Sequence, residues 1–242
     1  MPLTMRLATW NCRQGIDRKR HALDALDADV VVIPECSSDT ALARELGVSF
    51  LWRGDHPRKG LAVVGFNGWQ VEPLAVAVDL PWVLPVRVHS PDEGVAFDLL
   101  AIWTITRKDG RPNYAGQVKL ALETWSAALA DGNTAIAGDF NCSIQGLAHA
   151  PHRANVQRLK DLGLESSYHA AEDLEHGLED AMTLIWIGRG RIPLAYHCDF
   201  VFLPPRLLAS VTAVRIGWSP EPDDRLSDHA PVSVDLALTL PR

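Results

Sequence analysis

Four strand-like segments follow one another between residues 61 and 103 with no helical pattern between them. They cover residues 61–66, 71–78, 82–88 and 95–103, and glycine, proline or aspartate residues bound them. A parallel α/β protein alternates strands with helices, so this run indicates consecutive antiparallel strands. Together with strand patterns near both termini and a long helical pattern at 112–130, it favours an α+β protein. We expect two mixed, mainly antiparallel sheets packed face to face, with helices outside.

Shorter patterns complete this picture. Residues 30–33 are apolar throughout, which predicts a strand buried on both faces. Helices are predicted at residues 17–26, 40–46 and 152–162, and further strands at 5–10, 134–137, 181–187, 198–203, 210–216 and 231–238. No internal repeat, low-complexity tract or linker interrupts the chain, so we expect a single domain over residues 1–242.

Hydrophobicity and charge argue against a membrane-spanning protein and against a non-specific nucleic-acid binder. The apolar runs are strand-sized and none approaches the roughly 18 residues that a membrane span needs. A strand pattern begins at Met5 without a preceding basic and apolar leader, so we expect a cytoplasmic protein, and a monomer. The formal charge of −7 argues against a broad basic surface for non-specific nucleic-acid binding. It does not exclude a nuclease, because a bound metal ion supplies positive charge at the phosphate.

Four cysteines are spread along the chain: Cys12, Cys36, Cys142 and Cys198. They form no C-x-x-C pair, which argues against a zinc knuckle. Each directly adjoins a polar residue, in turn Asn11, Glu35, Asn141 and Asp199. Because neighbours in a strand face opposite sides, we expect reduced cysteines in the core behind polar residues that face a cleft.

Polar residues end apolar strands in five places: Thr9-Trp10-Asn11, Ile33-Pro34-Glu35, Gly138-Asp139-Phe140-Asn141, His197-Cys198-Asp199 and Ser227-Asp228-His229. One such strand end is ordinary turn chemistry. Five in one chain indicate that these strand ends lie together at one edge of the sheets, which we call the rim. Glu35, Asp139 and Asp228 supply the oxygen ligands that Mg²⁺ or Mn²⁺ prefers. A histidine beside them contacts a phosphoryl oxygen or acts as an acid or base.

The same residues form an ordered series that resembles the endonuclease/exonuclease/phosphatase superfamily, which has a deoxyribonuclease I-like fold. The series is Trp-Asn at 10–11, Glu35, Gly-Asp-Phe-Asn at 138–141, Asp199 and Ser-Asp-His-Ala-Pro at 227–231. It spans residues 5–235, nearly the whole chain. The resemblance implies a four-layer α/β/β/α sandwich and metal-dependent hydrolysis of a phosphoester by water.

The resemblance also implies a metal site. Glu35 would bind the ion, Mg²⁺ or Mn²⁺, with Asn11 beside it and Asp228 assisting. A cation on a phosphoryl oxygen relieves the repulsion between an anionic phosphodiester and hydroxide.

The catalytic roles that the resemblance implies fall on four residues. Asp139 would orient or deprotonate the attacking water, and Asn141 would hold the phosphate or a metal. His229 would donate to the scissile phosphate, and Asp199 would orient that histidine. Because in-line displacement needs the nucleophile and the leaving group on opposite sides of the phosphorus, we expect Asp139 and His229 on opposite sides of it.

Two positions depart from the family pattern. Arg13 stands where many members carry an aspartate, so a metal ligand is missing or the ion sits differently. Trp103 stands where many members carry a histidine or tyrosine, so leaving-group protonation must come from elsewhere.

Further substrate contacts are expected from Lys59 as a point charge, from Tyr114 at a helix start, and from His197. His197 precedes Asp199 by two residues, and alternation along a strand would turn both toward the cleft. Trp186 offers a face for base stacking. An ordinary structural role stays open for each of these residues.

These features favour a divalent-metal-dependent phosphodiesterase or nuclease acting on a phosphoester, with nucleic acid as one candidate substrate. The alternative is a hydrolase of a small phosphoester, such as a nucleotide, sugar or lipid head-group phosphate. A non-catalytic binding module is less favoured, because the chain retains Glu35, Asp139 and His229.

Overall fold

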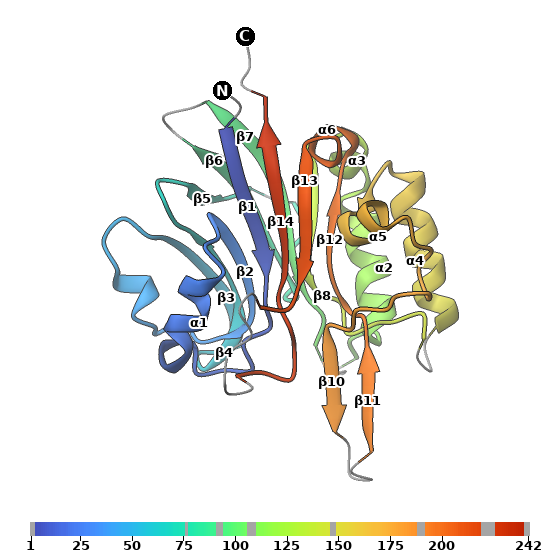
Figure 1. Cartoon of the computed structure of the whole chain (residues 1–242), viewed down its shortest axis with the longest axis horizontal. Coiled ribbons are helices and arrows are strands. Elements are labelled where there is room, and N and C mark those ends of the chain that lie inside the picture. Colours follow the sequence, from blue (N-terminus) through green and yellow to red (C-terminus); the bar gives the residue numbers. More distant parts are fainter. Residues whose placement is uncertain are drawn as a thin grey trace.

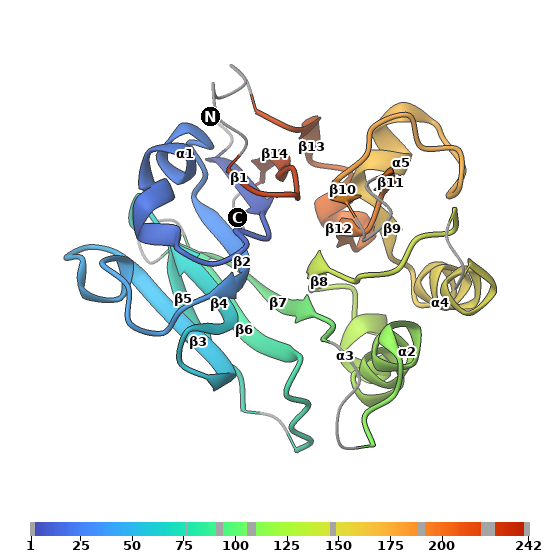
Figure 2. The same ribbon diagram turned by 90° about the horizontal axis from the view of Figure 1, so that it is seen from below.

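A computed structural model describes residues 3–75, 77–90, 94–105, 110–145, 149–187, 192–218 and 226–239. Two six-stranded sheets pack against each other around a shared apolar core, and a two-stranded hairpin projects below them (Figure 1). Seen from below, helices flank the outer face of each sheet (Figure 2). The four-layer α/β/β/α sandwich expected from the sequence is therefore confirmed.

The first sheet joins both ends of the chain. Its order is β13 (Val211–Ile216), β14 (Val232–Leu238), β1 (Leu3–Thr9), β2 (Val30–Cys36), β4 (Lys59–Gly65) and β3 (Ser49–His56). Only β1 and β2 are parallel in it; the other neighbours are antiparallel.

The second sheet has the order β5 (Gln70–Pro73), β6 (Val83–Ser90), β7 (Val95–Trp103), β8 (Thr134–Asp139), β12 (Asp199–Leu203) and β9 (Glu165–Ser166). Here only β7 and β8 are parallel. Both sheets are thus mixed and mainly antiparallel, as predicted.

Helices cover the outer faces. The first sheet carries the 3₁₀ turn η1 (Ile16–Lys19) and α1 (Arg20–Ala25), while η2 (Leu42–Arg44) precedes β3. The second sheet carries α2 (Tyr114–Thr124), α3 (Ser126–Ala130) and α4 (His149–Asp161). Two short helices, α5 (Ser167–Glu172) and α6 (Pro205–Leu208), flank β12 (Figure 1).

Side-chain alternation builds the layers. Val30 and Val32 point into the core between the sheets, whereas Val31 and Ile33 pack on the η1–α1 side. The uninterrupted apolar run at 30–33 is therefore buried on both faces, as predicted. Each buried valine or isoleucine contributes about 1.5–3 kcal/mol relative to an exposed one, which holds β2 at the centre of its sheet.

Local details differ from the sequence prediction. The helix expected at residues 40–46 is only the short turn η2, and the strand expected at 71–78 ends at Pro73. Strand β3 was not predicted: it is a half-exposed edge strand, so it has no clean alternation of apolar and polar residues. Among the residues that the structure describes, no helix is long and apolar enough to cross a membrane.

The cysteines lie where the sequence predicts. All four are buried and free of disulfides. Burial raises the pKa of Cys12 and of Cys142 to about 12, so both stay as thiols at neutral pH.

The two ends of the sandwich differ. The start of β1 and the end of β14 lie at the upper end in Figure 1, and the hairpin of β10 (Leu184–Ile187) and β11 (Pro193–Tyr196) projects from the lower end. Strand β1 runs downward in this view, so the residues that follow Thr9 lie at the lower end. The polar strand ends gather there.

Candidate active site

Asp139 lies at the end of β8 and is fully buried. Its Oδ2 accepts hydrogen bonds from the side-chain amides of Asn11 and Asn141, each at 2.9 Å, and its Oδ1 accepts one from the Asn141 backbone at 2.8 Å. Gly138 precedes it with φ 141°, where a Cβ would lie 1.8 Å from the Ile102 carbonyl oxygen. Only glycine lets β8 approach β7 closely enough to set this carboxylate at the rim.

His229 and Asp199 form a buried pair beside Asp139. Asp199 opens β12 directly opposite Asp139 on β8, so the two carboxylates come from neighbouring strands. His229 Nδ1 donates to Asp199 Oδ2 at 2.8 Å, and its Nε2 lies 3.9 Å from Asp139 Oδ2. The structure thus brings together three of the predicted catalytic side chains and Asn141.

The charges in this cluster shift each other. Burial and the nearby Asp199 raise the pKa of Asp139 above its ordinary value, and His229 and Asn11 offset this only in part. Burial alone would lower the pKa of His229, but Asp199 and Asp139 outweigh it and raise that pKa well above its usual range. The arrangement therefore favours a cationic His229, a hydrogen-bond donor, beside a carboxylate more basic than usual.

The other motif residues hold this cluster in place. The Trp10 indole donates to the His229 carbonyl at 3.2 Å. The Ser227 hydroxyl donates to the Asn11 carbonyl at 2.7 Å and accepts from the His229 backbone at 3.1 Å. These bonds join the first and last motifs, which are more than two hundred residues apart.

Glu35 occupies a bulge at the end of β2. It has a left-handed φ of 61°, and the register with β4 shifts between Pro34 and Cys36. The Cys12 amide donates to the Pro34 carbonyl at 3.2 Å, which keeps the end of β2 beside the segment that carries Asn11. Such strained backbone persists where surrounding structure holds it, often at functional sites.

A cleft of about 280 Å³ opens beside these strand ends. Glu35, Lys59, Trp103, Tyr114 and Asn141 are among the residues that line it. Lys59 Nζ lies 3.1 Å from Glu35 Oε1 and 5.3 Å from the centre of the Trp103 ring. The Trp103 ring therefore contacts the lysine here, at the position where the family pattern has a histidine or tyrosine in many members.

Asp228 and Arg13 face each other at the other side of the rim. Arg13 Nε lies 3.7 Å from Asp228 Oδ2, so the residue that departs from the family pattern pairs with a predicted metal ligand. Arg13 also has a left-handed φ of 50°. Both residues line a small pocket together with Trp186 of the β10–β11 hairpin.

The donor set on this rim suits a hard cation. Glu35 and Asp228 offer carboxylates and Asn11 an amide oxygen, the ligand types of Mg²⁺ and Mn²⁺. Lys59 and Arg13 balance the two carboxylates, and a divalent ion would compete with them. A second group, Asp139, Cys198, Asp199 and His229, offers ligand atoms within 4.8 Å of one another. Its carboxylate and imidazole groups already engage one another, which suits proton handling better than a hard ion.

Two expectations about geometry need correction. The structure places His197 away from the cleft: it is buried, and its Nδ1 donates to the Ala181 carbonyl at 2.8 Å. Strand β12 begins only at Asp199, so strand alternation does not extend back to His197. His229 Nε2 lies 3.9 Å from Asp139 Oδ2, so the two groups lie next to each other and a phosphorus does not fit between them.

Sequence reasoning missed one positioning residue. The Thr183 hydroxyl accepts from the backbone amides of Cys198 and Asp199, both at 3.0 Å, and so holds the start of β12. It also missed Arg53 and Arg111, which line the cleft and pair with Asp79 and Asp55. Nothing local in the sequence marks these three residues, because each acts on a segment distant in the chain.

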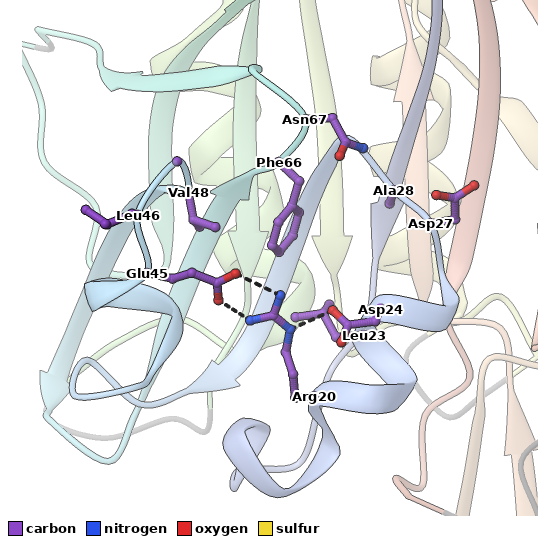
Figure 3. A pocket seen from close by; sticks show the side chains of 11 residues that line it. Arg20, Leu23, Asp24, Asp27, Ala28, Glu45, Leu46, Val48, Phe66 and Asn67 are labelled. Atoms are coloured by element: carbon purple, nitrogen blue, oxygen red, sulfur yellow. Dashed lines mark hydrogen bonds and ion pairs between the residues drawn. The ribbon is translucent and has the colours of Figure 1, made fainter.

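A further pocket lies on the outer side of the first sheet (Figure 3). Arg20 crosses it and pairs with Glu45 and Asp24. None of the predicted site residues lines it. Its charged groups satisfy one another, so it does not compete with the rim as the candidate site.

Comparison with known proteins supports the fold. No protein-family model and no curated protein matches the chain. A Neisseria 3′ phosphatase bound to a product DNA hairpin matches 96% of the chain over 99% of its own, with 19% identity and a TM-score of 0.69. An AP endonuclease from Archaeoglobus fulgidus matches 95% of the chain over 98% of its own, with 16% identity and a TM-score of 0.70.

The endonuclease domain of TRAS1, a telomere-specific retrotransposon, matches 97% of the chain over 99% of its own, with 17% identity and a TM-score of 0.67. These matches extend over nearly the whole chain in each case. The chain therefore has the fold of the endonuclease/exonuclease/phosphatase superfamily, as its motifs implied.

Proposed function

We propose that this protein is a divalent-metal-dependent phosphodiesterase that cleaves nucleic acid. The buried Asp199–His229 pair, 3.9 Å from a carboxylate held by two asparagine amides, carries the proposal. Asp139 would take a proton from the attacking water, and His229 would donate to the phosphate oxygen that gains charge. The similar Neisseria phosphatase, whose structure contains a product DNA hairpin, supports nucleic acid as the substrate class.

Glu35, Asn11 and Asp228 would hold the ion, Mg²⁺ or Mn²⁺. When bound, the ion would neutralise phosphate charge and lower the barrier to attack. Lys59, Tyr114 and Asn141 line the same cleft as Glu35 and would position the substrate phosphate. His197 drops out of the substrate contacts, because it is buried elsewhere.

Hydrolysis of a small phosphoester is the second candidate. The cleft, at about 280 Å³, is at the lower end of the size of small-molecule sites. The net charge of −7 adds no long-range attraction for duplex DNA. A cytoplasmic, monomeric protein stays our prediction for either function.

The test is hydrolysis across plasmid DNA, DNA with an abasic site, RNA and small phosphoesters, with Mg²⁺, with Mn²⁺ and after exhaustive chelation. We expect activity on nucleic acid that chelation abolishes and Mg²⁺ or Mn²⁺ restores. Glu35→Gln should need far more metal for half-maximal rate, whereas Glu72→Gln on β5, outside the cleft, should match the wild type. Full activity after chelation, or in Glu35→Gln, would contradict the metal site.

A substitution in the exposed β10–β11 hairpin distinguishes the two candidate substrate classes, nucleic acid and small phosphoesters. Trp186 is 49% exposed on β10 and lines a pocket with Asp228, where a base can stack on its ring. Stacking contributes about 1–3 kcal/mol per base, so Trp186→Ala should lower kcat/KM on nucleic acid by about 5- to 150-fold. Its rate on a small phosphoester should not change. An equal loss on both substrates would indicate structural damage instead.

A further inference from the structure

A second buried cluster lies outside the candidate active site. His152 on α4, His169 on α5, and His176 and His197 in loops gather around the carboxylate of Glu179. His152, His169, His197 and Glu179 are each at most 6% exposed. Burying this many imidazoles around one carboxylate has no role in the chemistry proposed above.

Three of these side chains are close enough to share an ion. His169, His176 and Glu179 each offer a ligand atom, and these atoms lie within 4.8 Å of one another. His169 Nε2 is 3.1 Å from Glu179 Oε1. The ring of His197 is centred 5.4 Å from that of His169.

Several ring nitrogens in the cluster lack partners. Both nitrogens of His152, Nδ1 of His176 and Nε2 of His197 are buried without a hydrogen bond from any residue that the structure describes. Buried polar atoms in folded proteins are nearly always paired, and exceptions mark a bound ion, a water or a functional group. The unpaired nitrogens of His176 and His197 point to a ligand that accepts imidazole lone pairs, whereas His152 lies outside the group whose ligand atoms are close enough to share an ion.

Two of these rings, those of His197 and His169, are oriented by a contact of their Nδ1 atom. His197 Nδ1 donates to the Ala181 carbonyl, which leaves its Nε2 with a free lone pair. His169 Nδ1 contacts the Ser166 hydroxyl at 2.8 Å, with Nε2 facing Glu179. Metal-binding histidines are held in this way, by a hydrogen bond from the ring nitrogen that does not bind the ion.

Glu179 is held as an anion in the same cluster. Its Oε1 accepts from the Gly177 amide at 2.9 Å, and its Oε2 accepts from the Gln145 side chain at 3.1 Å. These hydrogen bonds, with the contact to His169 Nε2, fix the carboxylate beside the imidazole rings. Neutral imidazole and carboxylate are the protonation states that coordinate metal ions.

We propose that His169, His176, His197 and Glu179 form a structural zinc site. Nitrogen ligands with one carboxylate suit Zn²⁺ and do not suit the hard Mg²⁺ ion. The ion would tie the loop over residues 173–183 to α5 and to the start of β12. This site is independent of the proposed phosphodiesterase, and its test needs no substrate.

One movement is required for the ion to bind. The rings of His169 and His176 are stacked, with centroids 3.5 Å apart and planes 12° from parallel. An imidazole binds a metal in its own plane, so the His176 ring must turn. His176 lies in a loop and is partly exposed, and its ring would have to leave its stack on His169 to do so. The competing view is a purely aromatic cluster, in which these rings simply stack on Phe200 and Phe202.

The experiment titrates Zn²⁺ into the full chain after chelation and measures bound zinc by atomic emission and Tm by calorimetry. We expect one Zn²⁺ per chain and, at a hundredfold excess over Kd, a rise in Tm of about 5–10 °C. Co²⁺ in place of Zn²⁺ should give visible d–d bands without a thiolate charge-transfer band. A thiolate band would place the ion at Cys198 in the active-site cluster and overturn the proposal.

Matched variants locate the ion. Glu179→Gln keeps the shape of the side chain and His176→Gln changes a half-exposed loop residue, so circular dichroism should report a wild-type fold for both. Each should weaken Zn²⁺ binding by at least about 10-fold. His21→Gln on the exposed face of α1 should bind as the wild type does. Zinc binding that is absent in the wild type, or equal in all three variants, would leave the aromatic cluster as the explanation.

Discussion

Replacing Asp199 with asparagine tests how this carboxylate supports His229. His229 has two roles that the substitution should separate: it donates a hydrogen bond and it carries a positive charge. In the wild type the Asp199 carboxylate lies 2.8 Å from His229 Nδ1 and is completely buried. It is the nearest of the two anions that keep the histidine charged against the cost of burial. Asparagine keeps the shape and removes the charge.

The magnitude follows from that one bond. A buried hydrogen bond to a charged group contributes about 1.5–3 kcal/mol, which corresponds to about 1–2 pKa units for His229. In Asp199→Asn the pKa of His229 should therefore fall, because burial is no longer outweighed to the same extent. A histidine with a lowered pKa loses its second proton as pH rises, so activity should decline at a lower pH than in the wild type. At neutral pH we expect kcat/KM to fall by about 10- to 150-fold.

The assay is a pH–rate profile of kcat/KM on whichever phosphoester proves to be hydrolysed, with metal held constant. Asp98→Asn is the matched control, because Asp98 on β7 pairs with Arg87 and not with the site. The decline of the variant's activity at alkaline pH should begin about 1–2 pH units below that of the wild type, and the control should follow the wild type. A profile in Asp199→Asn that coincides with the wild type would refute the role of Asp199.

Three further outcomes follow from the structure. Asp139→Asn and His229→Ala should each lower kcat by about 10²–10⁴-fold while circular dichroism reports an unchanged fold, and wild-type rates in both would end the catalytic assignment. Gly138→Ala should lower the free energy of unfolding in urea by more than Gly163→Ala, because its Cβ would lie 1.8 Å from a carbonyl oxygen while the space at Gly163 is open. Equal losses would mean that β8 shifts without cost. Thiol titration should find all four cysteines only after denaturation, with the same count with and without reductant; a higher count with reductant would reveal a disulfide.

Much of the fold was predictable because it rests on local patterns. The period-2 alternation and the doubly apolar run at 30–33 follow from which face of a strand is buried. Strand ends such as Asp139 and Asp199 stand out because a carboxylate directly follows or precedes an apolar strand. Edge strand β3 was missed, since a half-exposed strand imposes little pattern on its residues.

The amino-acid sequence by itself determined the set of chemical groups and the two-sheet architecture that carries them. Only the tertiary structure decided which groups meet: Asn11 bonds to Asp139, Lys59 pairs with Glu35, and His197 turns away from the cleft. The reason is that alternation specifies a side within one strand, whereas the neighbour of that strand is chosen by packing between segments far apart in the chain. The same packing brings four histidines together around Glu179, and no spacing of these residues in the sequence predicts that cluster.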